Sequence, residues 1–317
     1  MKSVSRGSAT LGEGFKVGHW TNEVVPTGCT VIMPPPGNVT SCDIRGSSPS
    51  SRELAHLDPD RKLTEVHAIL LTGGSAFGLA AAEGVVDWLS ERKIGYQTGL
   101  VPVPIVPAAV IFDLAAADPQ ARPGRDAGRA ACDSASEGAV AIGRVGAGAG
   151  ATVGKWAGRE YLVPGGLGVA ELEDGSERVA ALAVVNAVGD VIGEDGRVVA
   201  GSSAPGADSR AAFRPEFPPP APDAPANTVL AVIATTAALD KREVRWLAAR
   251  GSDGITISVR PAHTRYDGDV VFAVSTPSED AGEAPPPNLD VLGHLATQAV
   301  AAAVRDAVAP TPRSADL

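Results

Sequence analysis

Long apolar runs alternate along this chain with polar stretches that are rich in glycine and proline. The runs at 179–188 and from 228 onward are almost wholly apolar, which is typical of strands with both faces buried. Shorter apolar segments predict two strands within 15–33, one over 66–72 and one over 270–276. The chain is therefore expected to build its core from several buried strands.

Three segments have the spacing and the end signals of helices. One follows the glycine loop 73–78 and extends to about residue 93. A second begins with Asp240 and Glu243, which have the spacing of a capping box, and Gly251 is expected to end it. A third, rich in alanine, begins at the cap Asn288 and extends to about residue 309. Helices and strands are thus both expected in this chain.

Two stretches are dominated by proline, serine and glycine. Residues 34–65 contain three consecutive prolines and a serine-rich segment, so we expect no regular structure there. Residues 201–227 contain seven prolines in 27 positions, which predicts an exposed, extended linker that builds no core. This linker leads directly into the apolar run that begins at Thr228.

Composition and charge narrow the class of protein. The 317 residues are 44% hydrophobic and carry a net charge of −10, so we expect a large core and no nucleic-acid binding, which needs clustered Lys and Arg. Residues 1–14 lack the apolar region of a signal peptide and no apolar run has the length of a membrane span, which favours a cytoplasmic protein. Cys29, Cys42 and Cys132 lack ligand spacing and predict neither disulfides nor a metal site.

Two glycine-rich segments invite a nucleotide-binding interpretation, but neither has the required spacing. Gly73, Gly74 and Gly78 do not form a G-x-G-x-x-G fingerprint. That loop is either a tight turn for close packing or a pocket wall whose backbone N–H groups face a substrate. Residues 143–155 lack the glycine at 149 and the Ser or Thr at 156 of a Walker loop. We therefore expect no cofactor, and the segment is of interest for Lys155, which is either solvated or directed inward by its glycine frame.

The junction Asn227-Thr228 joins the proline-rich linker to the apolar strand. Thr228 is either simply the first residue of a buried strand or a nucleophile that first cuts the chain in front of itself. Cleavage there would place a free α-amine on the same residue as the hydroxyl. Because an α-amine titrates near neutral pH, with a pKa of about 7.7–8.0, it can accept the hydroxyl proton and activate the nucleophile.

Other polar residues lie inside or next to the apolar strands. Asn186 interrupts the run 179–188, and a buried amide must find hydrogen-bond partners. It is either a bridge to the backbone or a donor for a substrate oxygen. Asp267 and Asp269 are two residues apart, so they share a face in an extended segment. They form either a solvated turn or a pair that orients a nucleophile.

Taken in order, these segments resemble the DmpA-type family of self-processing peptidases, which includes L-aminopeptidase/D-esterase enzymes, β-aminopeptidases and nylon-oligomer hydrolases. The resemblance spans roughly residues 12–308. It rests on the strand and glycine loop at 67–79, on Gly154-Lys155, on Val185-Asn186, on Asn227-Thr228, and on Pro261-Ala262-His263 with Asp267-Gly268-Asp269 and the strand after them.

The resemblance implies a four-layer αββα sandwich of the N-terminal-nucleophile type, an α/β (α+β) fold with one structural domain. It also implies autocleavage at Asn227–Thr228 into an α chain, 1–227, and a β chain, 228–317, with homo-oligomers that are often tetramers. Thr228 is the implied nucleophile, Lys155 and Asn186 line the site with Asn186 helping to hold the oxyanion, and Asp267 and Asp269 orient Thr228. Gly73, Gly74 and Phe112 are expected at the substrate pocket, and Phe112 stands where the nylon-oligomer hydrolases carry a tyrosine.

The predicted function is an autoprocessing amide hydrolase that acts on small peptides or linear amides through an acyl-Thr228 intermediate. The alternative is an unprocessed, non-catalytic scaffold or small-molecule-binding protein on the same fold. A metal- or nucleotide-dependent enzyme is disfavoured, because the sequence lacks ligand clusters. The sequence leaves the choice among peptide N-termini, β-amino amides and nylon-type amides open.

Overall fold

Two large β-sheets form the centre of the molecule in a computed structural model that describes residues 2–3, 8–115, 118–207, 227–277 and 286–309. The first has the strand order β1-β12-β13-β16-β18-β4, with β16 and β18 parallel and the other neighbours antiparallel. The second has the order β2-β3-β6-β9-β5, with β6 and β9 parallel. Smaller sheets are β10-β11, β15-β14-β17 and β7-β8.

The elements have the following bounds. The strands are β1 (Lys2–Ser3), β2 (Lys16–Thr21), β3 (Gly28–Met33), β4 (Val39–Ile44), β5 (Ser51–Arg52), β6 (Ile69–Thr72), β7 (Tyr96–Gln97), β8 (Pro102–Val103), β9 (Ala108–Val110), β10 (Thr152–Val153), β11 (Val163–Pro164), β12 (Gly166–Asp174), β13 (Glu177–Asn186), β14 (Asp190–Ile192), β15 (Val198–Ala200), β16 (Thr228–Thr235), β17 (Val259–Arg260) and β18 (Val270–Ser275). The helices are α1 (Ala81–Glu91), α2 (Arg125–Asp133), α3 (Lys241–Ser258) and α4 (Leu289–Val308).

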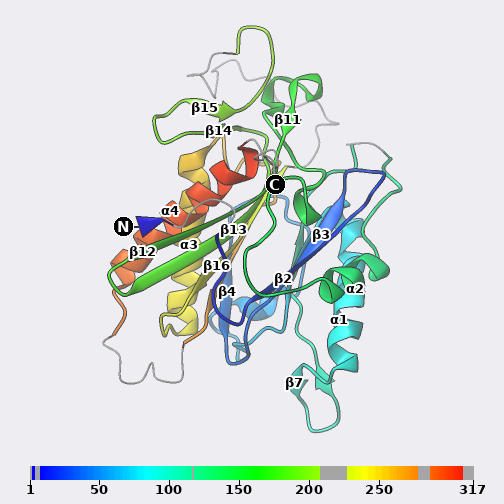
Figure 1. Cartoon of the computed structure of the whole chain (residues 1–317), viewed down its shortest axis with the longest axis vertical. Helices are drawn as coiled ribbons and strands as arrows, with labels where there is room; N and C mark the ends of the chain where they lie inside the picture. The colour runs from blue at the N-terminus through cyan, green and yellow to red at the C-terminus, as the bar shows by residue number, and fades with distance from the viewer. Residues whose placement is uncertain (1, 4–7, 116–117, 208–226, 278–285, 310–317) are drawn as a thin grey trace, which may run out of the picture.

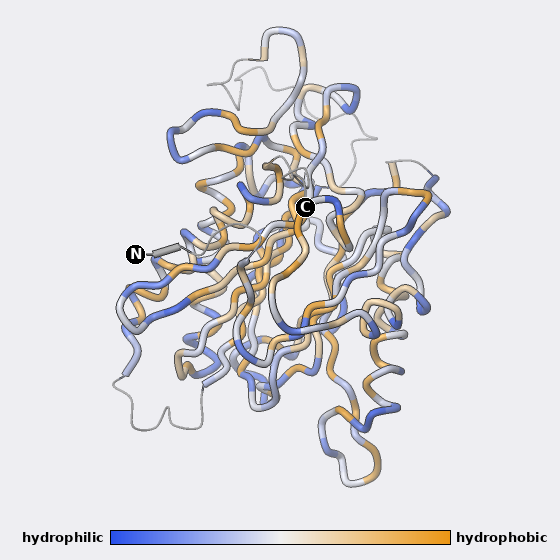
Figure 2. The backbone as a smooth tube through the Cα atoms, in the orientation of Figure 1, coloured by the Kyte–Doolittle hydropathy of each residue, from blue (hydrophilic) through white to orange (hydrophobic). Residues whose placement is uncertain are grey.

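The molecule has four layers, with the two large sheets face to face and a pair of helices on the outer face of each. α3 and α4 cover the six-stranded sheet, and α1 and α2 cover the five-stranded sheet (Figure 1). β16 shows why its sequence is apolar from Val229 to Ala234: Leu230 and Val232 pack between the sheets, whereas Val229 and Ile233 pack under α3 and α4. Figure 2 shows hydrophobic residues gathered along these central strands. The arrangement confirms the predicted αββα sandwich.

The prediction that 34–65 has no regular structure is wrong, because this segment contains β5 and also β4, which pairs with β18 at one edge of the six-stranded sheet. Polar residues obscure β4 in the sequence, but they are buried with partners. The Ser41 hydroxyl donates to the Leu57 carbonyl at 2.7 Å, and the Thr40 hydroxyl donates to Asn38 Oδ1 at 2.8 Å. A strand can therefore contain polar residues and still be buried when their side chains are hydrogen-bonded.

The helix that begins at the predicted capping box does not end at Gly251. Asp240 accepts hydrogen bonds from the N–H groups of Arg242 and Glu243, as predicted, but α3 continues to Ser258. A Cβ on Gly251 would lie 2.3 Å from Ile233 Cδ1, and one on Gly254 would lie 2.4 Å from the Thr297 carbonyl oxygen. These glycines therefore serve close packing of α3 against β16 and α4 and do not terminate the helix.

The proline-rich linker predicted over 201–227 falls largely outside the described residues, which omit 208–226. No helix in the part of the chain that the structure describes is long and apolar enough to cross a membrane.

Candidate active site

Thr228 is the first residue of β16, in the middle of the six-stranded sheet, and is 4% exposed. Its hydroxyl donates to the carbonyl oxygen of Asn227 at 2.5 Å. The same carbonyl accepts the backbone N–H of Gly268 at 2.8 Å. Since β16 and β18 are adjacent and parallel, the segment that precedes β18 lies beside the Asn227–Thr228 peptide bond. The hydroxyl, the carbonyl in front of it and a backbone donor are therefore already assembled.

Gly268 fits this place because it has no side chain. A Cβ there would lie 2.9 Å from Thr228 Oγ1 and 3.0 Å from the Ser48 carbonyl oxygen. Contacts this short force the neighbouring atoms to move. The glycine thus lets the backbone approach the Asn227 carbonyl closely.

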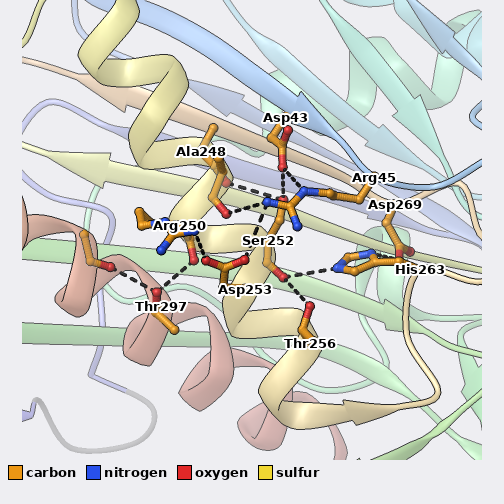
Figure 3. A network of polar contacts seen from close by, with 12 residues as sticks. Asp43, Arg45, Ala248, Arg250, Ser252, Asp253, Thr256, His263, Asp269 and Thr297 are labelled. Atoms are coloured by element: carbon orange, nitrogen blue, oxygen red, sulfur yellow. Dashed lines mark hydrogen bonds and ion pairs between the residues drawn. The ribbon is translucent and has the colours of Figure 1, made fainter.

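The two aspartates on either side of Gly268 are buried and make different contacts. Asp269 Oδ1 accepts the backbone N–H of Val229 at 2.6 Å, and Oδ2 lies 2.7 Å from His263 Nδ1 (Figure 3). Asp267 Oδ2 accepts the backbone N–H of Thr264 at 2.6 Å. Burial, with the nearby charge of Asp269, raises the pKa of Asp267 well above its ordinary range. Asp269 thus holds the backbone beside Thr228, while Asp267 carries a carboxyl that is protonated more easily than an ordinary aspartate.

Lys155 is buried with its ammonium inside the protein. Nζ donates to the Asn186 carbonyl at 3.0 Å and to Asn186 Oδ1 at 2.8 Å. Asn186 is the cross-strand partner of Thr228, so this contact brings Lys155 to the nucleophile's end of β16. Burial lowers the pKa of Lys155 to about 7, a shift that the charge of Asp267 opposes and the charge of Arg159 reinforces. An ammonium group has a third hydrogen, and its donation to a substrate stays a prediction.

Asn186 bridges three segments of chain. Its Oδ1 accepts the Thr152 N–H at 3.1 Å in addition to the Lys155 ammonium, and its Nδ2 donates to the Phe112 carbonyl at 3.2 Å. This is the bridging alternative left open by the sequence. Because an amide nitrogen carries two hydrogens, a role in holding an oxyanion stays a prediction.

A pocket of about 470 Å³ opens beside Lys155. The described residues that line it include Phe112 and three charged side chains besides Lys155. The lining residues are Pro26, Phe112, Asp113, Ala115, Arg144, Gly150, Thr152, Lys155, Arg159, Leu162 and Pro164.

Gly73 and Gly74 lie behind this lining and are not part of it. The Gly74 N–H donates to Asp113 Oδ1 at 2.6 Å, and the Gly73 N–H donates to the Gly28 carbonyl at 2.8 Å. A Cβ on Gly73 would lie 2.2 Å from Asp113 Oδ2. The glycine loop therefore packs closely and positions Asp113, which is the first of the two interpretations that its sequence allowed.

Sequence reasoning missed several residues that the structure brings to the site. Asp113 lines the pocket, and burial raises its pKa despite hydrogen bonds from Gly74 and Thr27. Gly268 and His263 were noted only as parts of a motif, and nothing in the spacing indicated their contacts. Among the described residues, no group of three or more His, Cys, Asp or Glu side chains is placed to hold a metal ion.

Solved structures share this fold over nearly the whole chain. A β-aminopeptidase of Burkholderia sp. has a TM-score of 0.69 at 22% identity, covering 96% of this chain and 86% of its own. The L-aminopeptidase D-Ala-esterase/amidase of Ochrobactrum anthropi, described as a variant of the Ntn-hydrolase fold, also has a TM-score of 0.69, at 20% identity, covering 97% and 87%. This chain thus shares the fold of these two structures, a variant of the Ntn-hydrolase fold.

Sequence comparison supplies the family. This chain belongs to peptidase family S58, whose family model matches residues 12–313. An uncharacterized aminopeptidase of Mycobacterium tuberculosis is 41% identical, covering 93% of this chain and 89% of its own. A 6-aminohexanoate-oligomer endohydrolase of Paenarthrobacter ureafaciens is 32% identical, covering 93% and 84%. The resemblance stated from the motifs is confirmed, and the protein is a hydrolase of amide bonds.

Proposed function

We propose that this protein is a self-processing linear-amide hydrolase in which Thr228 cuts the Asn227–Thr228 bond and then serves as the catalytic nucleophile. The observation that carries the proposal is the Thr228 hydroxyl at 2.5 Å from the Asn227 carbonyl oxygen, which also accepts the Gly268 N–H. These contacts bring the hydroxyl and a backbone donor to the Asn227 carbonyl, which supports an acyl shift at this bond.

In self-cleavage, Thr228 Oγ attacks the Asn227 carbonyl carbon, and the Gly268 N–H stabilises the negative oxygen. The C–N bond breaks as the Thr228 nitrogen takes the proton that the hydroxyl has lost, which leaves Asn227 attached through an ester. Water hydrolyses this ester and releases a carboxylate on Asn227. The products are residues 1–227 and a second chain, 228–317, that begins with a free α-amine on Thr228.

In turnover, the new α-amine takes the hydroxyl proton while Thr228 Oγ attacks a substrate amide. The tetrahedral oxyanion meets the third ammonium hydrogen of Lys155 and, once the Asn227 carboxylate moves away, the Gly268 N–H. Each preorganised donor contributes roughly 3–4 kcal/mol to the transition state. The substrate's amine leaves with a proton, and water releases the acyl group from Thr228.

For the substrate we propose a linear amide that carries a carboxylate at one end. Arg144 and Arg159 line the pocket, and among the described residues neither has an ion pair, although the chain as a whole carries a net charge of −10. Two guanidinium groups beside Lys155 favour an anionic chain end. The relative called a 6-aminohexanoate-oligomer endohydrolase acts, by its name, on linear amides, which supports this class.

We further propose a cytoplasmic homo-oligomer, with a tetramer of processed units as the expected state. The support is the family resemblance and the three cysteines, all free and buried, which suit a reducing compartment. Sedimentation equilibrium of the purified protein tests the tetramer, and a mass of one processed unit would overturn it.

The test of the processing proposal is intact mass together with N-terminal sequencing. Wild type should give two fragments, the smaller beginning at Thr228, whereas Thr228→Ala should remain one chain and be inactive. An uncut wild type that hydrolyses amides would refute self-processing. An uncut, inactive wild type would favour a non-catalytic protein on the same fold.

A further inference from the structure

His263 lies between β17 and β18, close to the nucleophile but outside the reacting atoms. Its Nδ1 lies 2.7 Å from Asp269 Oδ2, and its Nε2 lies 3.2 Å from the carbonyl oxygen of Ser252 on α3 (Figure 3). Its backbone has φ 53°, a left-handed conformation that is uncommon for residues other than glycine. This strained backbone, together with contacts on both ring nitrogens, indicates that the fold holds the His263 ring in one orientation.

The two partners of His263 indicate its protonation state. A backbone carbonyl only accepts, so Nε2 must carry a hydrogen. An ionised carboxylate also only accepts, so Nδ1 must carry one as well. With both nitrogens donating, His263 is an imidazolium, and its bond to Asp269 is a charge-assisted hydrogen bond.

Asp269 extends this contact to the nucleophile, because its other oxygen accepts the Val229 N–H at 2.6 Å. We propose that His263 is a positioning residue whose imidazolium fixes the orientation and the charge of Asp269, so that Asp269 holds the start of β16 and keeps Thr228 Oγ1 against the Asn227 carbonyl. The proposal rests on the proposed role of Thr228 as the nucleophile.

The acceptor on α3 is itself fixed in place. The Ser252 hydroxyl donates to Asp43 Oδ2 at 2.6 Å, and Asp43 pairs with Arg45 and Arg245, each at 2.8 Å. Figure 3 shows Asp43 and Arg45 next to Ser252 on α3. The Ser252 carbonyl belongs to the backbone of α3, so the helix sets its position independently of His263 and of the Ser252 hydroxyl.

Two charged groups act on His263. Asp269 comes from the loop before β18, and Arg45, which follows β4, pairs in turn with Asp43 and with Asp253 on α3. Burial and the charge of Arg45 lower the pKa of His263, but the hydrogen bond and the charge of Asp269 outweigh them and raise it above the ordinary value.

The upward shift of the His263 pKa determines how its contribution depends on pH. A histidine whose folded-state pKa is raised keeps its full contribution below its unfolded pKa, near 6.5, and loses that contribution as pH rises through the folded-state pKa. Self-cleavage and turnover should therefore fall on the alkaline side when His263 loses its proton. Lys155 and Asp267 titrate in the neighbouring range, so the assignment requires variants of His263 itself.

The experiment compares two neutral replacements. In His263→Asn the side-chain amide can replace Nδ1 toward Asp269, whereas in His263→Gln it can replace only Nε2 toward Ser252. The matched control Ser252→Ala keeps the backbone carbonyl that His263 contacts. Precursors are made by cell-free translation and transferred to buffers between pH 6 and 9, where cleavage is followed on gels. The kcat and KM are then measured on the cut fraction.

We expect His263→Gln to cleave and turn over ten- to a hundred-fold more slowly with KM little changed, which is the scale of a small misplacement of reacting groups. His263→Asn should recover part of the lost rate. In both variants the decrease in rate at alkaline pH that comes from deprotonation of His263 should be absent. Ser252→Ala should process at the wild-type rate. Circular dichroism checks that each variant folds.

A second measurement does not depend on activity. Long-range ¹⁵N–¹H NMR of histidine-labelled Thr228→Ala chain should show one of the five histidines protonated on both nitrogens at pH 7, and His263→Gln in that background should remove it. A neutral His263, or wild-type rates in His263→Gln, would overturn the positioning role while leaving Thr228 cleavage intact. Absence of wild-type cleavage at Asn227–Thr228 would instead overturn the proposed function.

Discussion

Replacing Lys155 by Met should make the folded protein more stable while it abolishes most of the activity. The ammonium is buried, and its pKa is about 7 instead of the ordinary 10.5. A lysine whose pKa is lowered by folding costs stability below the folded-state value, and the cost fades as pH rises to the unfolded value. Methionine has a similar length and carries no charge, so it removes this cost.

The gap between 10.5 and about 7, at about 1.4 kcal/mol per pH unit, amounts to a cost of about 5 kcal/mol below pH 7. The substitution also removes two hydrogen bonds to Asn186, each worth about 1.5–3 kcal/mol to a charged donor. Asn186 Oδ1 keeps the Thr152 N–H, which moderates that loss. With the lower figure for each bond the loss is about 3 kcal/mol, so the net gain at pH 6–7 is about 2 kcal/mol, or roughly 3 °C in Tm for a chain of this size.

The measurement is urea and thermal unfolding of Lys155→Met in the uncut Thr228→Ala background from pH 6 to 10. The gain should be largest at pH 6–7 and should turn into a loss toward pH 10, where the wild-type lysine is neutral. Lys241→Met is the matched control, because the buried Lys241 ammonium donates to the carbonyls of His56, Arg61 and Leu63, so its removal should destabilise the fold. A Lys155→Met variant that is less stable at every pH would show that Lys155 is a structural residue and would refute this reasoning.

Three further predictions concern the same site. Asp267→Asn and Asp269→Asn should each process slowly on time-resolved gels and give mature enzyme with low kcat and nearly unchanged KM. Wild-type processing and kinetics in both variants would show that the two aspartates have only a structural role. Gly268→Ala should slow self-cleavage by at least ten-fold, because its Cβ would meet Thr228 Oγ1 at 2.9 Å, and gels showing normal maturation would remove Gly268 from the site. Arg144→Gln and Arg159→Gln should raise KM several-fold for amides ending in a carboxylate but not for their amidated counterparts, with the exposed Arg242→Gln as control; equal effects on both substrates would contradict a carboxylate subsite.

Much of the fold could be predicted because its signals are local. The apolar run of β16 follows from burial on both faces, and Asp240 and Asn288 cap α3 and α4 as their spacing indicates. β4 could not be predicted, because its polar residues are satisfied by partners that are distant in the sequence, such as Leu57 and Arg245. The same applies to Gly251, whose role depends on its close packing against Ile233 of β16.

The candidate site was predictable only in part. Lys155 and Asn186 are in direct contact, and the segment with Asp267 lies beside Thr228, so residue types and order indicated a real cluster. The roles of Gly268 and His263 depend on backbone atoms of other segments, which leave no pattern in the sequence. A backbone donor or acceptor has the same chemistry in every residue, so only the fold identifies it.

The strand order of the six-stranded sheet has a consequence for refolding. β16 and β18 lie between β13 and β4, so cleavage at Asn227–Thr228 would leave two strands of the downstream chain inserted between strands of the upstream chain. The cut protein would then hold together without a covalent link, and its chains would separate only if the sheet opened. Folding of the precursor is unimolecular, whereas recovery of the unfolded mature enzyme would require an encounter of two chains. Its refolding yield should therefore depend on protein concentration, and that of the Thr228→Ala precursor should not.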